Sequence, residues 1–428
     1  MKLSLNFCRV ARITSLVRKA GTRSLGNHWL KFGVQALLTL VCLVFLAQIN
    51  PTLAQSPVSN SEIRGVWLTN IDSDVLYAPT SPDPGQPQLH QALKRLARLN
   101  FNTIYPTVWN WGYTLYPSSV AAAAIGRSVD PHPGLKGRDL LAELVQQGHR
   151  QGLAVIPWFE FGFMAPADSE LARRHPDWLT QRQDSTQVIK EGQDDRVWLN
   201  PFHPQVQQFI LALLSEIVQN YDVDGIQLDD HFGLPVELGY DPLTVNLYQQ
   251  EHQGNPPPSA QTPEWMKWRA DRLTDFIVEL TKTIKTVKPD VLISLSPNPQ
   301  AFSYTNFLQD WFTWQRRGLI DELILQVYRQ DMEPFRTELS QPEVQFTRQN
   351  IPVGIGILAG LKNRITPINL IATQVQTARQ QGYAGVSFFF YETIGSDRDP
   401  DFKSLFPTPS PRPPIVQVSQ RMTSKRKV

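Results

Sequence analysis

Two adjacent acids and a histidine follow a short apolar run near the middle of the chain. The stretch from Tyr221 to Phe232 reads Y-D-V-D-G-I-Q-L-D-D-H-F, and its run from Ile226 to Leu228 is typical of a buried strand. Asp229, Asp230 and His231 come directly after that run. Carboxylates are costly to desolvate unless they are paired or used in chemistry. The position therefore favours a functional site, with a helix N-cap or a structural ion pair as the simpler interpretation.

The alternation of side chains along this strand predicts which acid faces the interior. Gln227 and Asp229 lie on one side of the strand, whereas Ile226 and Leu228 lie on the other. The apolar pair should pack against helices, which leaves Gln227 and Asp229 on the side where a substrate would lie. Asp230 and His231 then begin the following loop, as residues that position Asp229 or contact the ligand.

Eight short β-rich runs alternate with amphipathic helices from Glu62 onward. The predicted strands are Ile63–Thr69, Thr103–Val108, Ala154–Phe159, Gly225–Leu228, Val291–Ser296, Leu323–Tyr328, Val353–Leu358 and Gly385–Phe390. Eight strand-helix units predict an α/β protein with a (β/α)8 TIM barrel. The links from strand to helix are long, as at 109–136 and 161–202, so we expect long loops on the C-terminal face, where barrel enzymes build their active sites.

Other carboxylates reach the same face from different strands. Glu160 follows the third predicted strand, and Glu392 lies just past the eighth. Glycoside hydrolysis requires one carboxyl group as acid and a second as nucleophile or base. We predict Asp229 as nucleophile or base and Glu160 as acid, because Trp158 and Phe159 beside Glu160 should raise its pKa by desolvation. Glu392 is the reserve candidate for the acid.

Aromatic residues gather at the predicted strand ends, where flat rings could stack on sugars. Each ring taken singly is more often a packing residue, but their convergence on one face favours a cleft for an extended glycan. The predicted substrate-binding rings are Trp67, Trp109, Trp111, Trp158 and Tyr328. Gln227, Asp230 and His231 are predicted to contact the substrate beside them.

The sequence also bears on other function classes. D-D-H suits a metal-dependent deacetylase too, but none of the eight histidines forms the i, i+3 or i, i+4 pair common in such sites, so no metal and no cofactor are predicted. Nucleotide-binding and serine-hydrolase motifs are absent. The net charge of +2 hides basic ends, since residues 1–61 hold seven Lys/Arg and residues 407–428 hold five, without acids. The remaining body is acidic, which argues against nucleic acid.

The chain ends have their own character. A basic region, the apolar core from Val34 to Ala47 and the sequence Thr52-Leu53-Ala54 predict a signal peptide over residues 1–54, or an uncleaved membrane anchor. Residues 55–61 are a predicted linker and 62–400 a single barrel domain. Both cysteines, Cys8 and Cys42, fall in the signal segment, which suits an exported protein. The Pro-rich, basic residues 401–428 are predicted to be disordered.

Several motifs resemble those of one known family. E-I-R-G-V-W-L-T-N at 62–70, W-L-N-P-F-H-P-Q-V at 198–206 and the stretch at 221–232 are similar to the glycosyl hydrolase-like 10 family, formerly domain of unknown function 187. S-L-S-P-N-P at 294–299 and L-Q-V-Y at 325–328 fit its later strands, and they add Asn298 and Gln326 to the expected substrate contacts. The chain departs from the family at His231, where a Tyr is more usual.

The resemblance implies an exported TIM-barrel glycosidase in which the Asp at position 229 has a role. We therefore expect a glycoside hydrolase that cleaves a polysaccharide, with a cell-envelope glycan of the peptidoglycan type as the expected substrate and two carboxylates in the mechanism. A non-catalytic glycan-binding barrel and a metal-dependent polysaccharide hydrolase or deacetylase are the alternatives.

Overall fold

The computed structural model describes residues 61–71, 73, 75–77, 88–361 and 363–414, and all of these belong to one compact unit. The predicted signal segment and all but the last residue of the predicted linker lie outside the described residues. Among the residues that are described, there is no helix with the length and apolar character needed to cross a bilayer.

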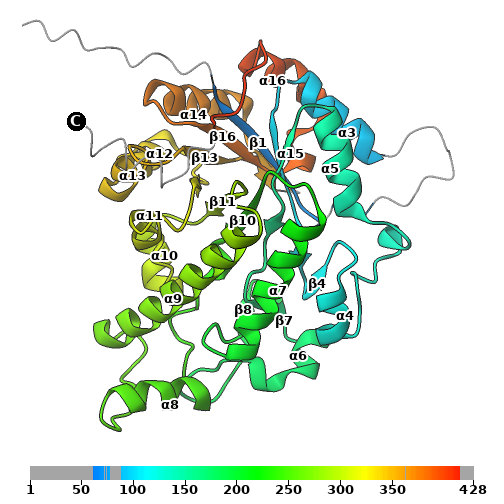
Figure 1. Cartoon of the computed structure of the whole chain (residues 1–428). Coiled ribbons are helices and arrows are strands. Elements are labelled where there is room, and N and C mark those ends of the chain that lie inside the picture. The colour runs from blue at the N-terminus through cyan, green and yellow to red at the C-terminus, as the bar shows by residue number, and fades with distance from the viewer. Residues whose placement is uncertain (1–60, 72, 74, 78–87, 362, 415–428) are drawn as a thin grey trace, which may run out of the picture. The chain divides into compact units, whose positions relative to one another are not determined.

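Parallel strands form the centre of the molecule (Figure 1). In sheet order they are β5 (Ala154–Val155), β2 (Thr103–Pro106), β1 (Ile63–Leu68), β16 (Gly385–Phe389), β13 (Val353–Leu358), β12 (Glu322–Gln326), β11 (Leu292–Ser296), β10 (Gly225–Asp229) and β6 (Trp158–Phe159). β5 and β6 are two halves of the third predicted strand. Ile156 N donates to Ile104 O on one side, and Gln227 N donates to Pro157 O on the other, so the sheet closes on itself. The predicted (β/α)8 barrel is confirmed.

Helices surround the barrel because each carries one apolar face. They are α3 (Gln88–Arg98), α5 (Leu140–Arg150), α7 (Pro204–Asn220), α9 (Pro263–Val287), α10 (Gln300–Phe307), α11 (Trp311–Arg316), α12 (Met332–Leu339), α13 (Pro342–Thr347), α14 (Ile368–Gln380), α15 (Tyr391–Ile394) and α16 (Asp399–Leu405). α7 shows the pattern most clearly, since Phe209, Leu213 and Ile217 are buried at helical spacing. Its first residue is Pro204, where the missing N–H costs little.

The barrel interior and the layer beneath the helices are separate hydrophobic clusters. The interior cluster contains Ile63, Trp67, Tyr105, Ile156, Trp158, Leu292, Ile324 and Phe390. Ile226 and Leu228 belong instead to the larger cluster that packs against the helices. Gln227 bonds to Trp67 within the interior, so the predicted inward direction of Gln227 and outward direction of its neighbours are confirmed.

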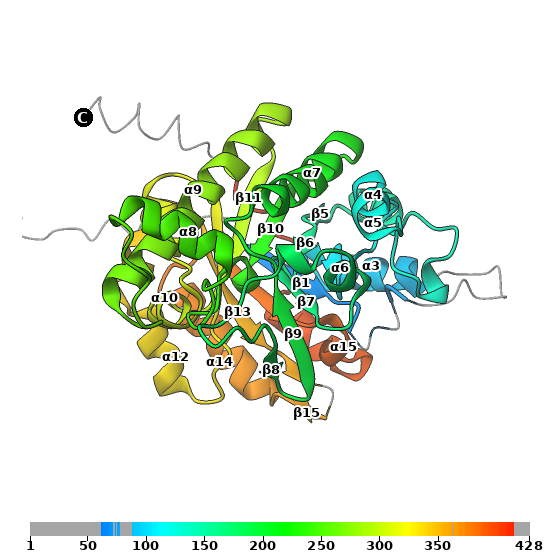
Figure 2. The ribbon, with the colours of Figure 1, turned by 90° about the horizontal axis from the view of Figure 1, so that it is seen from below.

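The extra length of the chain lies in the strand-to-helix loops, as predicted. These loops contain β3 (Trp109–Asn110), β4 (Tyr113–Thr114), β7 (Met164–Pro166), β8 (Ile189–Glu191), β9 (Asp194–Trp198), β14 (Gly360–Leu361), β15 (Arg364–Ile365), α4 (Ser119–Ile125), α6 (Glu170–Arg174), α8 (Pro242–Glu251) and the short 3-10 turns η1 (Pro133–Leu135), η2 (Pro176–Trp178), η3 (Asp230–Phe232) and η4 (Ser396–Arg398). Figure 2 shows the small β7-β9-β8 sheet with α6 and α8 on this face.

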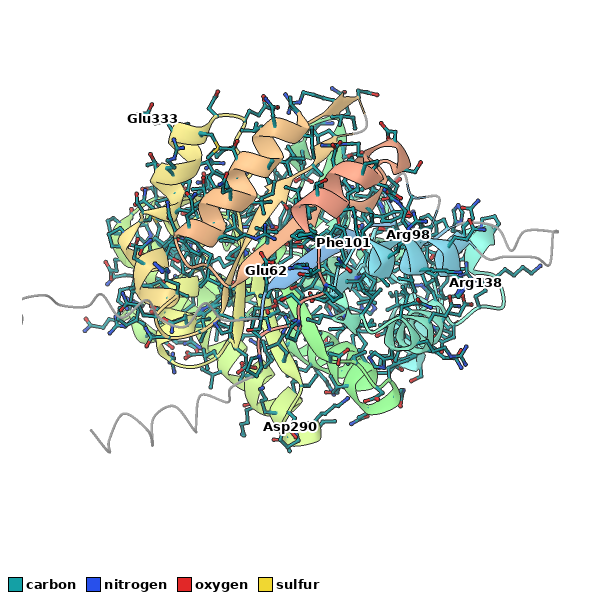
Figure 3. All side chains as sticks on the ribbon, turned by 90° about the horizontal axis from the view of Figure 1, so that it is seen from above. Glu62, Arg98, Phe101, Arg138, Asp290 and Glu333 are labelled. Atoms are coloured by element: carbon teal, nitrogen blue, oxygen red, sulfur yellow. The ribbon has the colours of Figure 1, made fainter. Side chains whose placement is uncertain are left out.

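The opposite end of the barrel corrects one prediction (Figure 3). Residues 401–414 are ordered rather than disordered: they include most of α16 and a Pro-rich segment that packs under the barrel. Prolines lack N–H donors, so this segment is held through its carbonyl groups and side chains. The carbonyl of Pro411 accepts from Glu62 N at 2.9 Å, and the carbonyl of Phe406, just before the prolines, accepts from Asn100 Nδ2 at 2.6 Å. Arg412 pairs with the buried Glu322. Composition predicted disorder because it does not reveal these partners.

Candidate active site

Asp229 is the last residue of β10, and its carboxylate is held on three sides. Oδ2 accepts a hydrogen bond from Trp158 Nε1 at 2.9 Å, and Oδ1 accepts from Gln326 Nε2 and from Asp230 N, both at 2.8 Å. Only 2% of the residue is exposed. These donors come from the neighbouring strand β6, from β12 and from the following turn, so the carboxylate is fixed at the mouth of the barrel.

The electrostatic environment of Asp229 is mixed. Burial and the adjacent Asp230 carboxylate raise the pKa of Asp229 well above its ordinary value, whereas the charge of His231 and the hydrogen bond from Asp230 N lower that pKa. Both carboxylate oxygens accept hydrogen bonds from N–H groups, and each such donor stabilises the ionised form against this rise in pKa. The contacts therefore favour a carboxylate that is ready to act as nucleophile or base.

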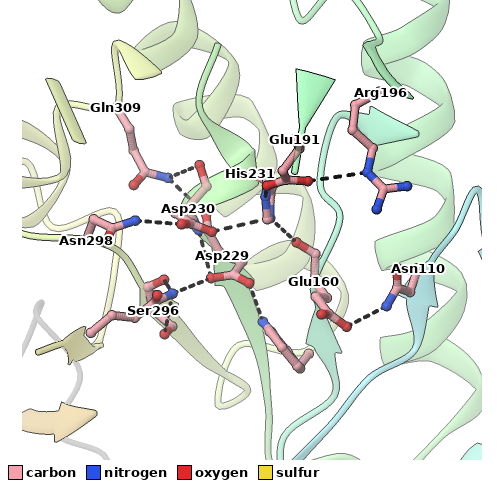
Figure 4. Close-up of polar contacts among 12 residues, drawn as sticks. Asn110, Glu160, Glu191, Arg196, Asp229, Asp230, His231, Ser296, Asn298 and Gln309 are labelled. Atoms are coloured by element: carbon pink, nitrogen blue, oxygen red, sulfur yellow. Dashed lines mark hydrogen bonds and ion pairs between the residues drawn. The ribbon is translucent and has the colours of Figure 1, made fainter. Parts of the chain in front are cut away.

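Asp230 begins the turn η3 and points toward the next strand. Its Oδ2 accepts from Asn298 Nδ2 at 2.6 Å, and its Oδ1 lies 3.3 Å from His231 Nδ1. Gln309 Nε2 donates to the backbone carbonyl of Asp229 at 2.9 Å, so the turn itself is also fixed. Figure 4 shows these contacts converging on the Asp229-Asp230 pair.

His231 lies between carboxylates and aromatic rings. Its Nδ1 lies 3.0 Å from the Glu160 carbonyl, and its Nε2 lies 3.9 Å from Glu191 Oε1 on strand β8. Burial alone would lower the pKa of His231, but Asp230, Glu191 and Asp229 together raise it to about 10. The ring is consequently an imidazolium at neutral pH, and its positive charge acts on the neighbouring acids.

Glu160 follows β6, on the strand adjacent to β10, and is also buried, with 6% exposed. Its Oε2 accepts from Thr107 Oγ at 3.0 Å and from Asn110 Nδ2 at 2.7 Å. Burial raises the pKa of Glu160 to about 7, against the lowering effects of Thr107 and His231. Both donors contact Oε2, which leaves Oε1 to carry a transferable proton. The predicted rise in pKa is found, and its main cause is the predicted desolvation.

Glu392 lies in the first turn of α15, after β16. β16 and β10 are separated by three strands in the closed sheet, whereas β6 and β10 are neighbours. The fold thus places Glu160 beside Asp229 and brings Glu392 in from the far side of the barrel.

The structure divides the predicted aromatic platform into two groups. Trp109 is fully buried against Phe159, with ring centroids 5.6 Å apart, so the prediction that it lines the cleft is wrong. Trp67 is buried in the barrel interior, where its indole N–H donates to Gln227 Oε1, so neither residue offers a face to a sugar. Both predictions fail for one reason. A position at a strand end does not reveal whether a ring points into the barrel, toward the helices or toward the mouth.

The remaining predicted contacts lie around the mouth. Trp158 is buried and orients Asp229, whereas Trp111 and Tyr328 are half-buried. The Tyr328 ring lies 5.6 Å from that of Phe389. Asn298 and Gln326 are half-buried and hold Asp230 and Asp229 respectively. Their contact with substrate stays a prediction.

Sequence reasoning missed several residues that hold the acids. Thr107 and Asn110 fix Glu160, Gln309 fixes the turn, and Glu191 contacts His231. Asn110 stands between two tryptophans at a strand end, which was a usable signal. Glu191 lies on a hairpin 38 residues before Asp229, where no local pattern points to it.

The three consecutive residues Asp229, Asp230 and His231 also offer one potential metal-binding atom each, all within 4.8 Å of one another. N–H groups from Trp158, Gln326 and Asn298 already engage the carboxylate oxygens of the two acids, and those donors suit free carboxylates. The donor set thus resembles a fixed acid pair more than a metal centre.

A closed barrel with buried carboxyl groups at the ends of adjacent strands, within a mouth built from long loops, belongs to the glycosidase-type class of TIM-barrel proteins. The family model described as glycosyl hydrolase-like 10 matches residues 62–377, and the chain belongs to this family. The family resemblance noted from the motifs is confirmed.

Known proteins agree with this assignment. The chain is 26% identical to glycosyl hydrolase DigH of Escherichia coli (strain K12) over 310 residues, which cover 64% of this chain and 67% of that protein. It is 23% identical to glycosyl hydrolase YngK of Bacillus subtilis (strain 168), over 69% of this chain and 59% of that protein. The PgaB (BpsB) glycoside hydrolase domain from Bordetella bronchiseptica shares the fold, with a TM-score of 0.62 and 18% identity over 81% of this chain and 98% of that domain. Together these findings support a glycan-acting hydrolase.

Proposed function

We propose that this protein is an exported glycoside hydrolase that cleaves a cell-envelope glycan of the peptidoglycan type with two carboxyl groups. The observation that carries the proposal is the pairing of Glu160 and Asp229 at the ends of adjacent strands, each buried and each fixed by neutral donors. Export rests on the predicted N-terminal signal. The envelope glycan rests on that signal together with the family resemblance.

The two acids have environments that suit different tasks. Glu160, with its pKa raised to about 7, can hold a proton near neutral pH and donate it to the oxygen of the leaving sugar. Asp229 accepts N–H donors on both oxygens, which favours the ionised form needed to attack the anomeric carbon or to activate a water. Asp230, His231 and Asn298 hold this arrangement in place.

The direct test is the release of reducing ends from purified wall glycan by the full chain, with and without a chelator. We expect release that is insensitive to the chelator. Loss of activity with the chelator, or release of acetate without reducing ends, would favour the metal-dependent hydrolase or deacetylase. Binding without any release, from wild type and over the whole pH range in which Glu160 titrates, would favour the non-catalytic barrel.

A further inference from the structure

An open groove of about 730 Å³ lies between the β3-β4 hairpin and the β7-β9-β8 sheet. Polar and aromatic side chains line it together. The lining residues that matter here are Trp111, Tyr113, Asp168, Asp194, Asp195 and Arg196. None of them belongs to the acid pair or to its hydrogen-bond partners.

Trp111 occupies an unfavourable backbone position in this groove. The β3-β4 register pairs Asn110 with Tyr113, so Trp111 and Gly112 form a two-residue turn, with φ of 55° and 77°. Two positive φ angles define the turn type that favours Asn-Gly, and a bulky side chain at the first position is strained. Strain of this kind is retained mostly at functional positions. The ring packs against Phe161, with centroids 5.4 Å apart, and a strained turn that holds a half-buried ring in an open groove is an arrangement that a bound ligand would explain.

Arg196 on β9 supports the ring from one side. Its guanidinium carbon lies 4.5 Å from the centroid of Trp111 and 5.3 Å from that of Phe161. Asp194 and Glu191 pair with the guanidinium at 2.9 Å and 3.3 Å, so the cation is held against the ring rather than free to bind an anion. Trp111 is thus a pre-oriented flat surface.

Two connections join the groove to the catalytic acids. Asn110, which directly precedes Trp111, donates to Glu160 Oε2 and also accepts from Trp111 N at 2.7 Å. On the other wall, Glu191 contacts both Arg196 and His231. The walls of the groove are therefore connected to the residues around the acid pair, and Figure 4 shows the contacts of Asn110 with Glu160 and of Glu191 with Arg196.

We propose that this groove is a distal sugar-binding subsite in which Trp111 stacks on an uncharged pyranose ring of the glycan whose bond is cleaved at Glu160 and Asp229. This assignment rests on the proposed function and deepens it. Asp168, Asp194 and Asp195 line the groove. Asp194 pairs with Arg196 at 2.9 Å and Asp195 with Lys190 at 2.6 Å, so among the described residues of this wall three carboxylates stand against two cations. Such a wall repels a carboxylate-bearing sugar, so the unit bound here is neutral, as an N-acetylhexosamine is.

Trp111→Asn is the decisive variant, because Asn suits positive φ angles and removes the ring. Both variants to be compared carry Glu160→Gln, so that turnover does not interfere. Calorimetry then measures binding of the dimer and hexamer of β-1,4-linked N-acetylglucosamine. We expect Trp111→Asn to weaken hexamer binding about tenfold, with dimer binding unchanged and Tm equal or higher.

Phe346→Asn in the same background is the matched control, since it removes an exposed ring outside the groove, and it should bind the hexamer normally. Trp111→Phe should restore part of the affinity. A hexauronate oligomer should bind the parent at least about tenfold more weakly than the neutral hexamer. Three results would overturn the subsite. They are equal hexamer affinity of the parent and Trp111→Asn, an equal loss of affinity for dimer and hexamer, and no hexamer binding by the parent. If Trp111→Asn weakens hexamer binding as expected but wild type releases no reducing ends, the proposed function alone would be overturned.

Discussion

At the mouth of the barrel Glu160 is buried and hydrogen-bonded to Thr107 and Asn110, whereas at the opposite end Glu322 is buried and paired with Arg412. Both residues belong to the same closed barrel and are buried, with 6% of Glu160 and 1% of Glu322 exposed. The hydrogen-bond donors to Glu160 are neutral, so burial has the largest effect on its pKa and raises it to about 7. Glu160 can therefore exchange a proton near pH 7. A cationic partner fixes an acid as a structural ion pair. The partner, rather than burial itself, separates the reactive acid from the structural one.

Asp229→Asn should have the largest effect, and it tests whether the acids at the mouth are reactive whereas Glu322 is structural. The variant keeps the size of the side chain, and its one amide oxygen can still accept from Trp158, so the fold should persist. It removes the negative charge and the acceptor that faces Gln326 and Asp230 N. We expect reducing-end release to fall by about 10³-fold or more. Near-normal activity on every glycan tested would show that the strand-end acids at the mouth are as structural as Glu322.

Arg412→Ala tests the other end of the barrel. It leaves the Glu322 carboxylate buried without its cation, which should destabilise the fold by about 3–5 kcal/mol in urea unfolding. The activity per folded molecule should not change. Adding Glu322→Gln should recover most of the stability, and a full loss of activity without a loss of stability would contradict the structural role.

Glu160→Gln sharpens the difference between the two acids. It should lower the rate on natural glycan by about 10²–10⁴-fold, because the leaving oxygen is no longer protonated. An activated aryl glycoside needs no such proton and should be spared. Unlike Arg412→Ala, this variant should unfold at nearly the wild-type urea concentration. Equal losses on both substrates would remove Glu160 from the role of acid.

Thr107→Val should produce the smallest effect, on pH dependence. The Thr107 hydroxyl donates to Glu160 and favours its ionised form, so its removal raises the pKa further above about 7. The acid then stays protonated to higher pH, and the alkaline limb of kcat/KM should move upward by roughly 0.5 to 1 pH unit.

Thr180→Val provides the control for that shift. Thr180 is equally buried and donates to Asp241, outside the acid pair, so its removal should leave the limb in place. A limb that moves downward in Thr107→Val, or that moves equally in both variants, would show that Glu160 does not control it.

The sequence predicted the barrel and the direction of Asp229 because both depend on short-range periodicity. Side chains alternate strictly along a strand, so Gln227 and Asp229 had to share a side. The ends of strands were less predictable: Trp109 turns into the outer core because the β3-β4 hairpin begins there, and no periodic pattern encodes that turn. Glu191 reaches His231 only through the pairing of β8 with β9. Arg412 finds Glu322 across 90 residues, where composition alone predicted disorder.

The hydrogen bond between Glu62 N and Pro411 O, 2.9 Å long, joins the first and last parts of the folded body at the end of the barrel away from the acids. A short peptide linking these two positions could thus replace the natural ends, and a circularly permuted chain could be opened in any exposed loop without cutting a barrel strand. Attachment to a solid support through either end would likewise leave the mouth of the barrel facing the solution. The immobilised protein could then still bind a glycan polymer that is too large to pass between the protein and the support.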